Sequence, residues 1–292
     1  MNETKRWRTS KALAGIALAA ALLLESATAS AGGVVVEIID GRKAKADITL
    51  PKPGGGNYTA EFEIEFERDG LENLTVECIG IGADVLDAGE IADIEGRLPH
   101  PWQTIDASFP VRVTVEPPAG CGLEFRDHYD VSLETDDLVF QPGSTYRLVK
   151  APIGGTFQYV TGEVTQGSVR VRGRTGGFSE FVIIKDATPS YAADCQDEYT
   201  TLATRLANAT MSPTARRALE TDLAVSRAAY ESGNFADAIA RLATFDAHCA
   251  AYGGEALPNV WRSLRDLDNV EGDMVGRTDN LRFMMGRLNG SP

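Results

Sequence analysis

Hydrophobic and acidic residues alternate along residues 60–67, and this period of two constrains the fold more than any other feature. Phe62, Ile64 and Phe66 share one face of an extended strand, while the glutamates between them lie on the other face. Similar alternating runs occupy residues 74–78, 109–115, 146–148, 169–171 and 178–184. Turn signals rich in glycine and proline separate these runs. Residues 32–188 therefore predict an antiparallel, immunoglobulin-like β-sandwich.

The hydrophobic period changes after residue 188 to that of an α-helix. Residues 235–252 carry an apolar stripe at i, i+3, i+4 spacing, which is typical of a helix packed against a core. Ser212-Pro213 suits the start of the preceding helix, and Gly233 suits its end. Residues 189–292 therefore predict a small all-α helical bundle.

The end of the chain predicts two further helices. One is expected to begin at Pro258. Its inward-facing residues are Trp261, Leu264, Leu267 and Val270. Gly272 and Gly276 weaken the helical pattern beyond Val270, because glycine in a helix interior costs about 1 kcal/mol relative to alanine. We therefore expect only a short last helix over residues 278–288.

The N-terminus has the three parts of a secretory signal peptide. Its basic residues are Lys5, Arg6, Arg8 and Lys11. An apolar run occupies residues 12–24, and Ala29-Ser30-Ala31 fits a cleavage site. The run is too short for a bilayer span, which needs about 20 residues. Residues 1–31 therefore predict export, with cleavage before Gly32, a periplasmic or extracellular location and no stable membrane insertion afterwards.

Acidic residues outnumber basic ones by 42 to 28, which gives a formal net charge of −14. This sign argues against a nucleic-acid partner, because phosphate binding depends on lysine and arginine. It also disfavours an anionic membrane surface. A net charge keeps an exported protein soluble, and this is enough to explain the negative charge. The partner classes that remain are an unknown protein or a glycan at the cell envelope.

The chain contains four cysteines, namely Cys78, Cys121, Cys195 and Cys249. An even number of cysteines in an exported chain indicates disulfides. Their spacings match neither a zinc site nor a redox motif. We expect one bond in each module, Cys78 with Cys121 and Cys195 with Cys249. The second bond conflicts with an up-down-up bundle, unless the first helix crosses the third or Cys195 lies in the preceding loop.

A stretch within the helical region resembles a known module. A helix rich in leucine and alanine is followed by Ser232-Gly233-Asn234, then by Ala238-Ile239-Ala240-Arg241-Leu242 and Thr244-Phe245, with a closing glycine pair. In these features residues 218–252 resemble the FIMAH domain of bacterial extracellular proteins. The resemblance implies secretion or surface association and no defined catalytic residue. Residues 176–183 look like the final strand of sandwich domains in exported bacterial proteins.

Motifs for catalysis are scarce. The chain has no G-x-S-x-G nucleophile elbow and no phosphate-binding glycine loop. His128 lies beside Asp127 and Asp130, which invites a triad, but this segment is more typical of a solvated entry to a strand. His100 lies in a proline-bounded loop, and His248 is expected on a helix surface. We assign no catalytic residue, no cofactor-binding residue and no metal ligand.

Two rows of opposite charge can be explained by pairing within the fold, without a catalytic role. The acidic row is Glu61, Glu63, Glu65 and Glu67, and the basic row is Arg170, Arg172 and Arg174. If their strands are neighbours, the rows pair across the sheet, and each pair contributes about 0.2–1 kcal/mol. A glycosidase instead needs two carboxylates in a cleft. We therefore favour an exported, non-catalytic binding or structural role at the envelope; the alternative is a secreted glycan hydrolase using paired carboxylates, so enzyme activity stays uncertain.

An acidic stretch raises the question of calcium. Residues 84–98 fit either a loop or an edge strand, and five carboxylates crowd them. They are Asp84, Asp87, Glu90, Asp93 and Glu95. Oxygen ligands in an irregular loop suit calcium, but the EF-hand pattern is missing. We do not assign a calcium site.

Overall fold

The computed structural model of the chain describes residues 33–67, 70–141, 143–165 and 167–290. The expected signal peptide and its cleavage site lie outside these residues. Gly32–Pro292 forms one compact unit, in which sheets precede helices. The expected boundary at residues 188 and 189 falls between the last strand of the sheets and the first long helix. Within the described ranges, no helix is long and apolar enough to cross a membrane.

The first sheet has six antiparallel strands in the order β1-β2-β3-β8-β12-β11. They are β1 (Gly33–Ile39), β2 (Lys43–Pro51), β3 (Asn57–Phe66), β8 (Tyr129–Val139), β12 (Ser168–Thr175) and β11 (Glu163–Thr165). The turn between β1 and β2 places Asp40 and Gly41 at φ values of 50° and 76°. Positive φ at both central residues is the geometry that a tight, twisted hairpin requires.

The second sheet has the order β10-β9-β13-β6-β4, with β5 beside β13. Its strands are β4 (Ile81–Val85), β5 (Gln103–Ile105), β6 (Val111–Val115), β9 (Tyr146–Ala151), β10 (Gln158–Tyr159) and β13 (Glu180–Asp186). Strand β13 is buried on both faces: Phe181 and Ile183 join the core between the sheets, while Val182 and Ile184 pack under α2 (Ala88–Gly96). Burial on both faces explains why this strand is continuously apolar.

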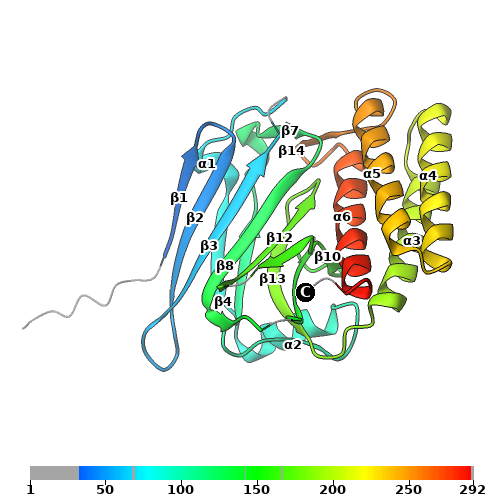
Figure 1. Cartoon of the computed structure of the whole chain (residues 1–292). Coiled ribbons are helices and arrows are strands. Elements are labelled where there is room, and N and C mark those ends of the chain that lie inside the picture. The colour runs from blue at the N-terminus through cyan, green and yellow to red at the C-terminus, as the bar shows by residue number, and fades with distance from the viewer. Residues whose placement is uncertain (1–32, 68–69, 142, 166, 291–292) are drawn as a thin grey trace, which may run out of the picture. The chain divides into compact units, whose positions relative to one another are not determined.

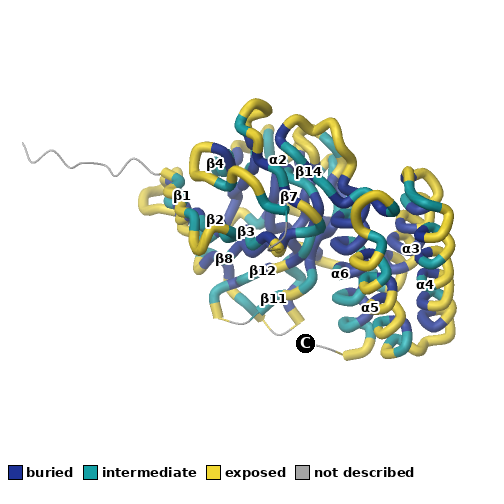
Figure 2. Tube along the Cα trace, turned by 90° about the horizontal axis from the view of Figure 1, so that it is seen from above, coloured by how far each residue is buried: buried dark blue, intermediate teal, exposed yellow. Residues whose placement is uncertain are grey.

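The two large sheets face each other across one hydrophobic core. The ring centroids of Phe62 on β3 and Phe181 on β13 are 5.5 Å apart. Phe62, Ile64 and Phe66, which the alternating pattern placed on one face, are all buried. Figure 2 shows buried residues in the interior strands and along the helices, and exposed residues on the outermost elements. The prediction of antiparallel sheets followed by a helical region is confirmed.

Four long helices follow the sheets and share a second core. They are α3 (Tyr191–Asn208), α4 (Pro213–Glu231), α5 (Phe235–Tyr252) and α6 (Val270–Leu288). The expected cap at Ser212 is present, since its side chain accepts a hydrogen bond from the Ala215 backbone, and Asn234 caps α5 in the same way by accepting from the Asp237 backbone. Figure 1 shows the helices side by side next to β12, with β1 at the opposite end of the sheet.

The helix expected from Pro258 is not formed. Instead β14 (Val260–Arg262) pairs with β7 (Glu124–Arg126) in a small separate sheet. The Trp261 ring stacks on Phe125, with centroids 5.3 Å apart, so this residue belongs to the core of the sheets. Leu264 and Leu267, expected to face inward, are 60% and 43% exposed. Tertiary packing of one tryptophan overrides the local helical spacing here.

The last helix, α6, is longer than expected, because Gly272 and Gly276 lie within it rather than before it. These two glycines allow the helix backbone to approach the sheet closely. A Cβ atom at Gly272 would lie 2.6 Å from the Cα atom of Gly176, and one at Gly276 would lie 2.5 Å from the carbonyl oxygen of Arg174. These distances are shorter than any ordinary contact. The glycines therefore let the helix backbone pack directly on the end of β12.

One of the two expected disulfides is present. Cys78 and Cys121 are bonded, with Cα atoms 5.5 Å apart, which confirms the first pair. Cys78 lies in a short helix, α1 (Val76–Ile79), rather than in the expected strand, and Cys121 ends a 3-10 turn.

The second expected bond is wrong, because Cys195 and Cys249 are free and buried. Connections of only four and three residues join α3 to α4 and α4 to α5, so successive helices run antiparallel and α3 and α5 run parallel. Cys195 lies in the first turns of α3 and Cys249 in the last turn of α5, at opposite ends of the bundle.

Candidate functional site

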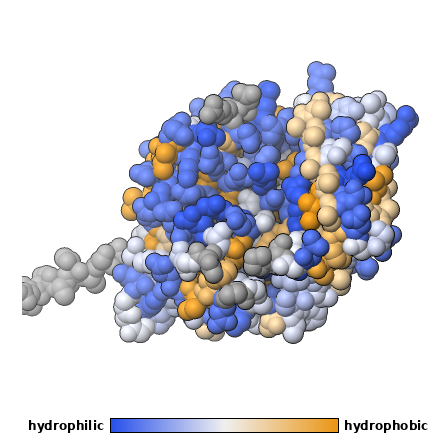
Figure 3. Space-filling view, viewed as in Figure 1, coloured by the Kyte–Doolittle hydropathy of each residue, from blue (hydrophilic) through white to orange (hydrophobic). Residues whose placement is uncertain are grey.

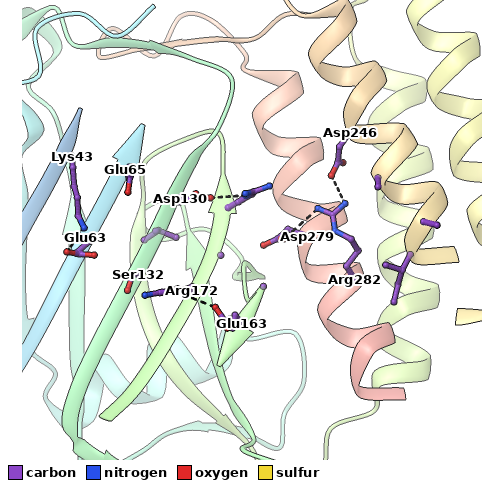
Figure 4. A pocket seen from close by; sticks show the side chains of 17 residues that line it. Lys43, Glu63, Glu65, Asp130, Ser132, Glu163, Arg172, Asp246, Asp279 and Arg282 are labelled. Carbon is purple, nitrogen blue, oxygen red and sulfur yellow. Dashed lines mark hydrogen bonds and ion pairs between the residues drawn. The ribbon is translucent and has the colours of Figure 1, made fainter. Parts of the chain in front are cut away.

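The outer face of the first sheet carries a groove of about 1000 Å³ between the strands and helices α5 and α6. The strands supply charged side chains, among them Lys43, Glu63, Glu65, Asp130, Glu163, Arg172 and Arg174. The α5 wall is small and apolar, with Ile239, Ala240 and Ala243. Figure 3 shows this hydrophilic sheet surface beside the more apolar helix, and Figure 4 shows the charged side chains converging from both walls.

A second hollow of about 480 Å³ continues along the same face. It is lined by residues 47–49 of β2, 59–61 of β3, 134–136 of β8, and 168 and 170 of β12. The larger groove uses neighbouring positions of the same four strands, so the two hollows lie end to end along the strand direction. We call the combined surface the sheet groove. Ten carboxylates and five basic side chains line it, which gives it a net negative charge.

The two charged rows do not pair with each other, because β8 lies between β3 and β12. The glutamates bind β2 and its turn instead: Glu61 with Lys45 at 2.8 Å, Glu63 with Lys43 at 2.6 Å and Glu65 with Arg42 at 2.8 Å. The arginines bind β8 and β11: Arg170 with Glu134, Arg172 with Glu163 at 3.8 Å and Arg174 with Asp130 at 2.8 Å. The result is a lattice of ion pairs across the sheet groove.

Helix α6 contributes charged groups that the sequence did not reveal. Arg282 forms ion pairs with Asp246 of α5 and, at 3.6 Å, with Asp279 of its own helix. Burial raises the pKa of Asp279, while the Arg282 and Arg174 charges oppose that rise. A side chain at Gly162 would collide with the Asp279 carboxylate, so this glycine leaves room for it. No local sequence pattern indicated these groups, because the α6 residues lie far along the chain from the strands that they face.

The histidines do not assemble a catalytic triad. His128 Nδ1 is buried without a hydrogen-bond partner, its Nε2 lies 3.8 Å from Glu67, and burial lowers the pKa of the ring. Asp127 Oδ1 accepts a hydrogen bond of 2.7 Å from Asn259 and therefore does not orient His128. Asp130, the third member considered, pairs with an arginine of β12.

The other two histidines make single carboxylate contacts. His100 Nε2 lies 2.7 Å from Asp194 Oδ1, and its ring stacks on Trp102 with centroids 4.5 Å apart. His248 Nδ1 lies 2.6 Å from Asp222 Oδ2 on the surface of the bundle. Each contact joins two elements of the fold, and a reactive nucleophile accompanies neither in the contacts described.

The acidic stretch at residues 84–98 forms β4 and α2, not a loop or an edge strand alone. Asp87 caps α2 in a capping box with Glu90. Asp84 and Glu90 both bind Arg112, Asp93 binds Arg97, and Glu95 accepts from the Ile105 backbone. Within the ranges that the structure describes, no group of three or more histidine, cysteine or carboxylate side chains suits a metal ion.

A second concentration of charges lies partly buried where the helices meet the sheets. Arg277 of α6 binds Glu198 of α3 at 2.9 Å, and Asp273 of α6 binds Arg205 of α3 at 2.9 Å. Lys150 of β9 is buried beside them, and burial lowers its pKa to about 8. We call this group the junction. Its charges are shared between sheet and helix, so it ties the two parts of the fold together.

Glu271, at the start of α6, is a further buried carboxyl group with a perturbed pKa. Burial and then the nearby Asp127 carboxylate together raise its pKa to about 8, against a hydrogen bond from Asn259 that lowers it. Its Oε2 atom is buried without a hydrogen-bond partner. At neutral pH this carboxyl group is therefore mainly protonated, because its folded pKa lies above 7.

Comparison with known proteins adds a family but not an activity. No curated protein and no solved structure matches the chain. The model of DUF6689, a family of unknown function, matches residues 18–289. The matched range contains both large sheets and all four long helices described above, so the sheet groove and the junction both lie inside it. The chain belongs to this family of unknown function, DUF6689.

Proposed function

We propose that the protein is exported, loses residues 1–31, and acts at the cell envelope as a non-catalytic binding protein. The sheet groove is its binding surface, and the ligand is an extended, positively charged polymer segment. The observation that carries this proposal is the alignment of two hollows along one sheet face, lined by twice as many carboxylates as basic groups. An elongated acidic groove matches an extended cationic chain in both shape and charge.

Other features support binding rather than catalysis. The ion pairs of the sheet groove are partly exposed: the Asp130 and Arg174 side chains are 56% and 39% exposed. Exposed pairs contribute at most about 1 kcal/mol to stability, so a ligand can exchange partners with them at small cost. The FIMAH-like helices support a surface or secreted location. The immunoglobulin-like topology stays a prediction, and the β1–β2–β3 meander, which departs from the immunoglobulin strand order, counts against it.

Calorimetric titration of the mature protein tests the proposal. A short lysine peptide should bind, with an affinity that falls as salt rises, because the attraction is electrostatic. A glutamate peptide of equal length and a neutral glycan oligomer should not bind. Intact mass of the exported protein should show a chain beginning at Gly32.

A matched pair of variants locates the site. Glu63→Gln with Asp130→Asn removes two carboxylates from the sheet groove and should weaken lysine-peptide binding about tenfold. Glu77→Gln with Glu255→Gln changes the net charge equally at exposed positions outside the groove, and binding should be kept. Equal weakening by both pairs would mean that only the overall charge attracts the peptide, and the proposed site would be wrong.

Glycan hydrolysis is a second candidate, favoured by one observation. Asp279 and Asp130 both line the groove, and burial together with the Asp130 charge raises the pKa of Asp279. A raised pKa suits a general acid, and paired carboxylates catalyse glycoside hydrolysis. Chromogenic glycosides test this directly. Turnover that disappears in folded Asp279→Asn would favour hydrolysis over binding, whereas an absence of turnover across the panel would count against it.

A further inference from the structure

Among the residues that the structure describes, strand β1 forms the outer end of the first sheet and pairs only with β2. It is seven residues long, whereas the other strands at the ends of the large sheets, β11, β10 and β4, have three, two and five residues. A strand at an edge leaves alternate backbone N–H and C=O groups unpaired. The longest described edge therefore offers the most complete template for another strand.

The composition of β1 lacks the devices that usually protect an edge. Its sequence, Gly-Val-Val-Val-Glu-Ile-Ile, contains no proline or lysine and a single charge, Glu37. Val35 and Ile39 are 69% and 37% exposed. Val34, Val36 and Ile38 pack against the rim of the core between the sheets and are only partly buried. The strand thus has an apolar inner face, and it lies at the end of the first sheet (Figure 1).

We propose that β1 pairs antiparallel with β1 of a second copy of this chain, which joins two first sheets into one across a two-fold axis. Side chains directly opposite each other in such a pair lie on the same face of the sheet. Only registers that place Val34, Val36 and Ile38 opposite their counterparts keep the inner face continuous.

The charge on β1 selects among these registers. When the two-fold axis passes between Val36 and its counterpart, Val34 lies opposite the partner's Ile38 and Glu37 lies opposite the partner's Val35. This register pairs all seven residues of the strand. Centring the pair on Glu37 sets two glutamates opposite each other, which is unfavourable. Centring it on Val35 leaves part of the strand unpaired. The sequence of β1 is therefore self-complementary in one register.

This interface is independent of the proposed function. The sheet groove lies over β2, β3, β8, β11 and β12, and β1 supplies none of its lining residues. In the dimer the two grooves lie on one continuous sheet. Loss of the dimer therefore leaves each groove intact, and a failure of lysine-peptide binding leaves the dimer in place.

Sedimentation velocity of the mature protein, from about 1 to 100 µM, measures the association. We expect a concentration-dependent dimer. Val35→Glu places a glutamate opposite the partner's Glu37 at two symmetric contacts, and it should weaken the dimer about tenfold or more. Val139→Glu is the matched control, because Val139 is an equally exposed valine (72%) at the end of β8, and it should leave the dimer unchanged.

Adding Glu37→Lys to Val35→Glu tests the register, since each glutamate then faces a lysine and dimerisation should return. Thermal melting of every variant checks that the monomer remains folded. Monomers at all concentrations would overturn the proposal. Equal weakening by Val35→Glu and Val139→Glu would also overturn it, and a double variant that stays monomeric would refute the register.

Discussion

The sheet groove and the junction use the same residue types in opposite ways. In the groove, Asp130 and Arg174 are 56% and 39% exposed, whereas at the junction Glu198 and Arg277 are 11% and 15% exposed. Exposed ion pairs are worth about 0–1 kcal/mol, but removing one partner of a buried pair costs about 3–5 kcal/mol. The comparison teaches that the Arg277–Glu198 pair holds helices α3 and α6 together, while the Asp130–Arg174 pair is exposed enough to meet the ligand that we propose.

Helix α6 serves both regions from different faces. Asp273 and Arg277 point to the junction, and Asp279 and Arg282 line the groove. Gly272 and Gly276 seat the helix on the sheet. The position of the groove wall therefore depends on the packing of the junction.

The largest expected effect is at Arg277. Arg277→Ala leaves Glu198 buried without its partner and should lower the free energy of unfolding by about 3–5 kcal/mol in urea titrations. Arg174→Ala, the matched change in the groove, should cost less than about 1 kcal/mol. Similar costs for both variants would remove the distinction between the two regions.

Glu271 should make the stability of the fold depend on pH. Its folded pKa of about 8 lies above the ordinary value of 4.5, so its stabilising contribution is complete below about pH 4.5 and is lost as pH rises through 8. Between pH 5 and 8 the free energy of unfolding should fall by about 2–4 kcal/mol relative to Glu271→Gln. Parallel pH profiles for the wild type and the variant would show that this group does not titrate there.

Gly276→Ala should destabilise the fold by about 2 kcal/mol or more, because the added Cβ meets the backbone of β12. Gly96→Ala in α2 is the control, since no atom lies within 4 Å of the added Cβ there, and it should be neutral or slightly stabilising. Chemical denaturation of both variants measures the difference. A tolerated Gly276→Ala would contradict the close approach of α6 to the sheet.

The smallest effect concerns the thiols. Burial raises the pKa of Cys195 to about 12 and also raises the pKa of Cys249. Because the thiolate is the reactive form, neither cysteine should react with a thiol reagent in the folded protein. Two thiols per chain should appear on unfolding without reductant. Four thiols, or none, would contradict the single Cys78–Cys121 bond.

Periodic patterns predicted much of the fold, because they report which face of an element is buried. Phe62 and its neighbours revealed β3, and the apolar stripe of α5 revealed that helix. The last third of the helical region was harder to predict from the sequence. A three-residue strand such as β14 is too short to show a period, and the glycines of α6 have low helix propensity while their value lies in tertiary contact.

The candidate site was only half visible in the sequence. The glutamate and arginine rows were found, but their pairing was not, because strand order decides it and β8 intervenes. Asp279 and Arg282 join the groove from more than 100 residues farther along the chain than Arg174, so no local pattern links them. The Cys195–Cys249 pairing failed because it rested on the even number of cysteines, while the helices run in the up-down-up arrangement with which that bond conflicts.

The most direct test of the central claim is a single variant measured twice. Asp130→Asn should weaken binding of the lysine peptide several-fold while changing the free energy of unfolding by less than about 1 kcal/mol, because Asp130 is exposed in the groove. That result would assign the groove charges to binding. Unchanged affinity combined with a large loss of stability would show that the sheet face is structural and would contradict the account.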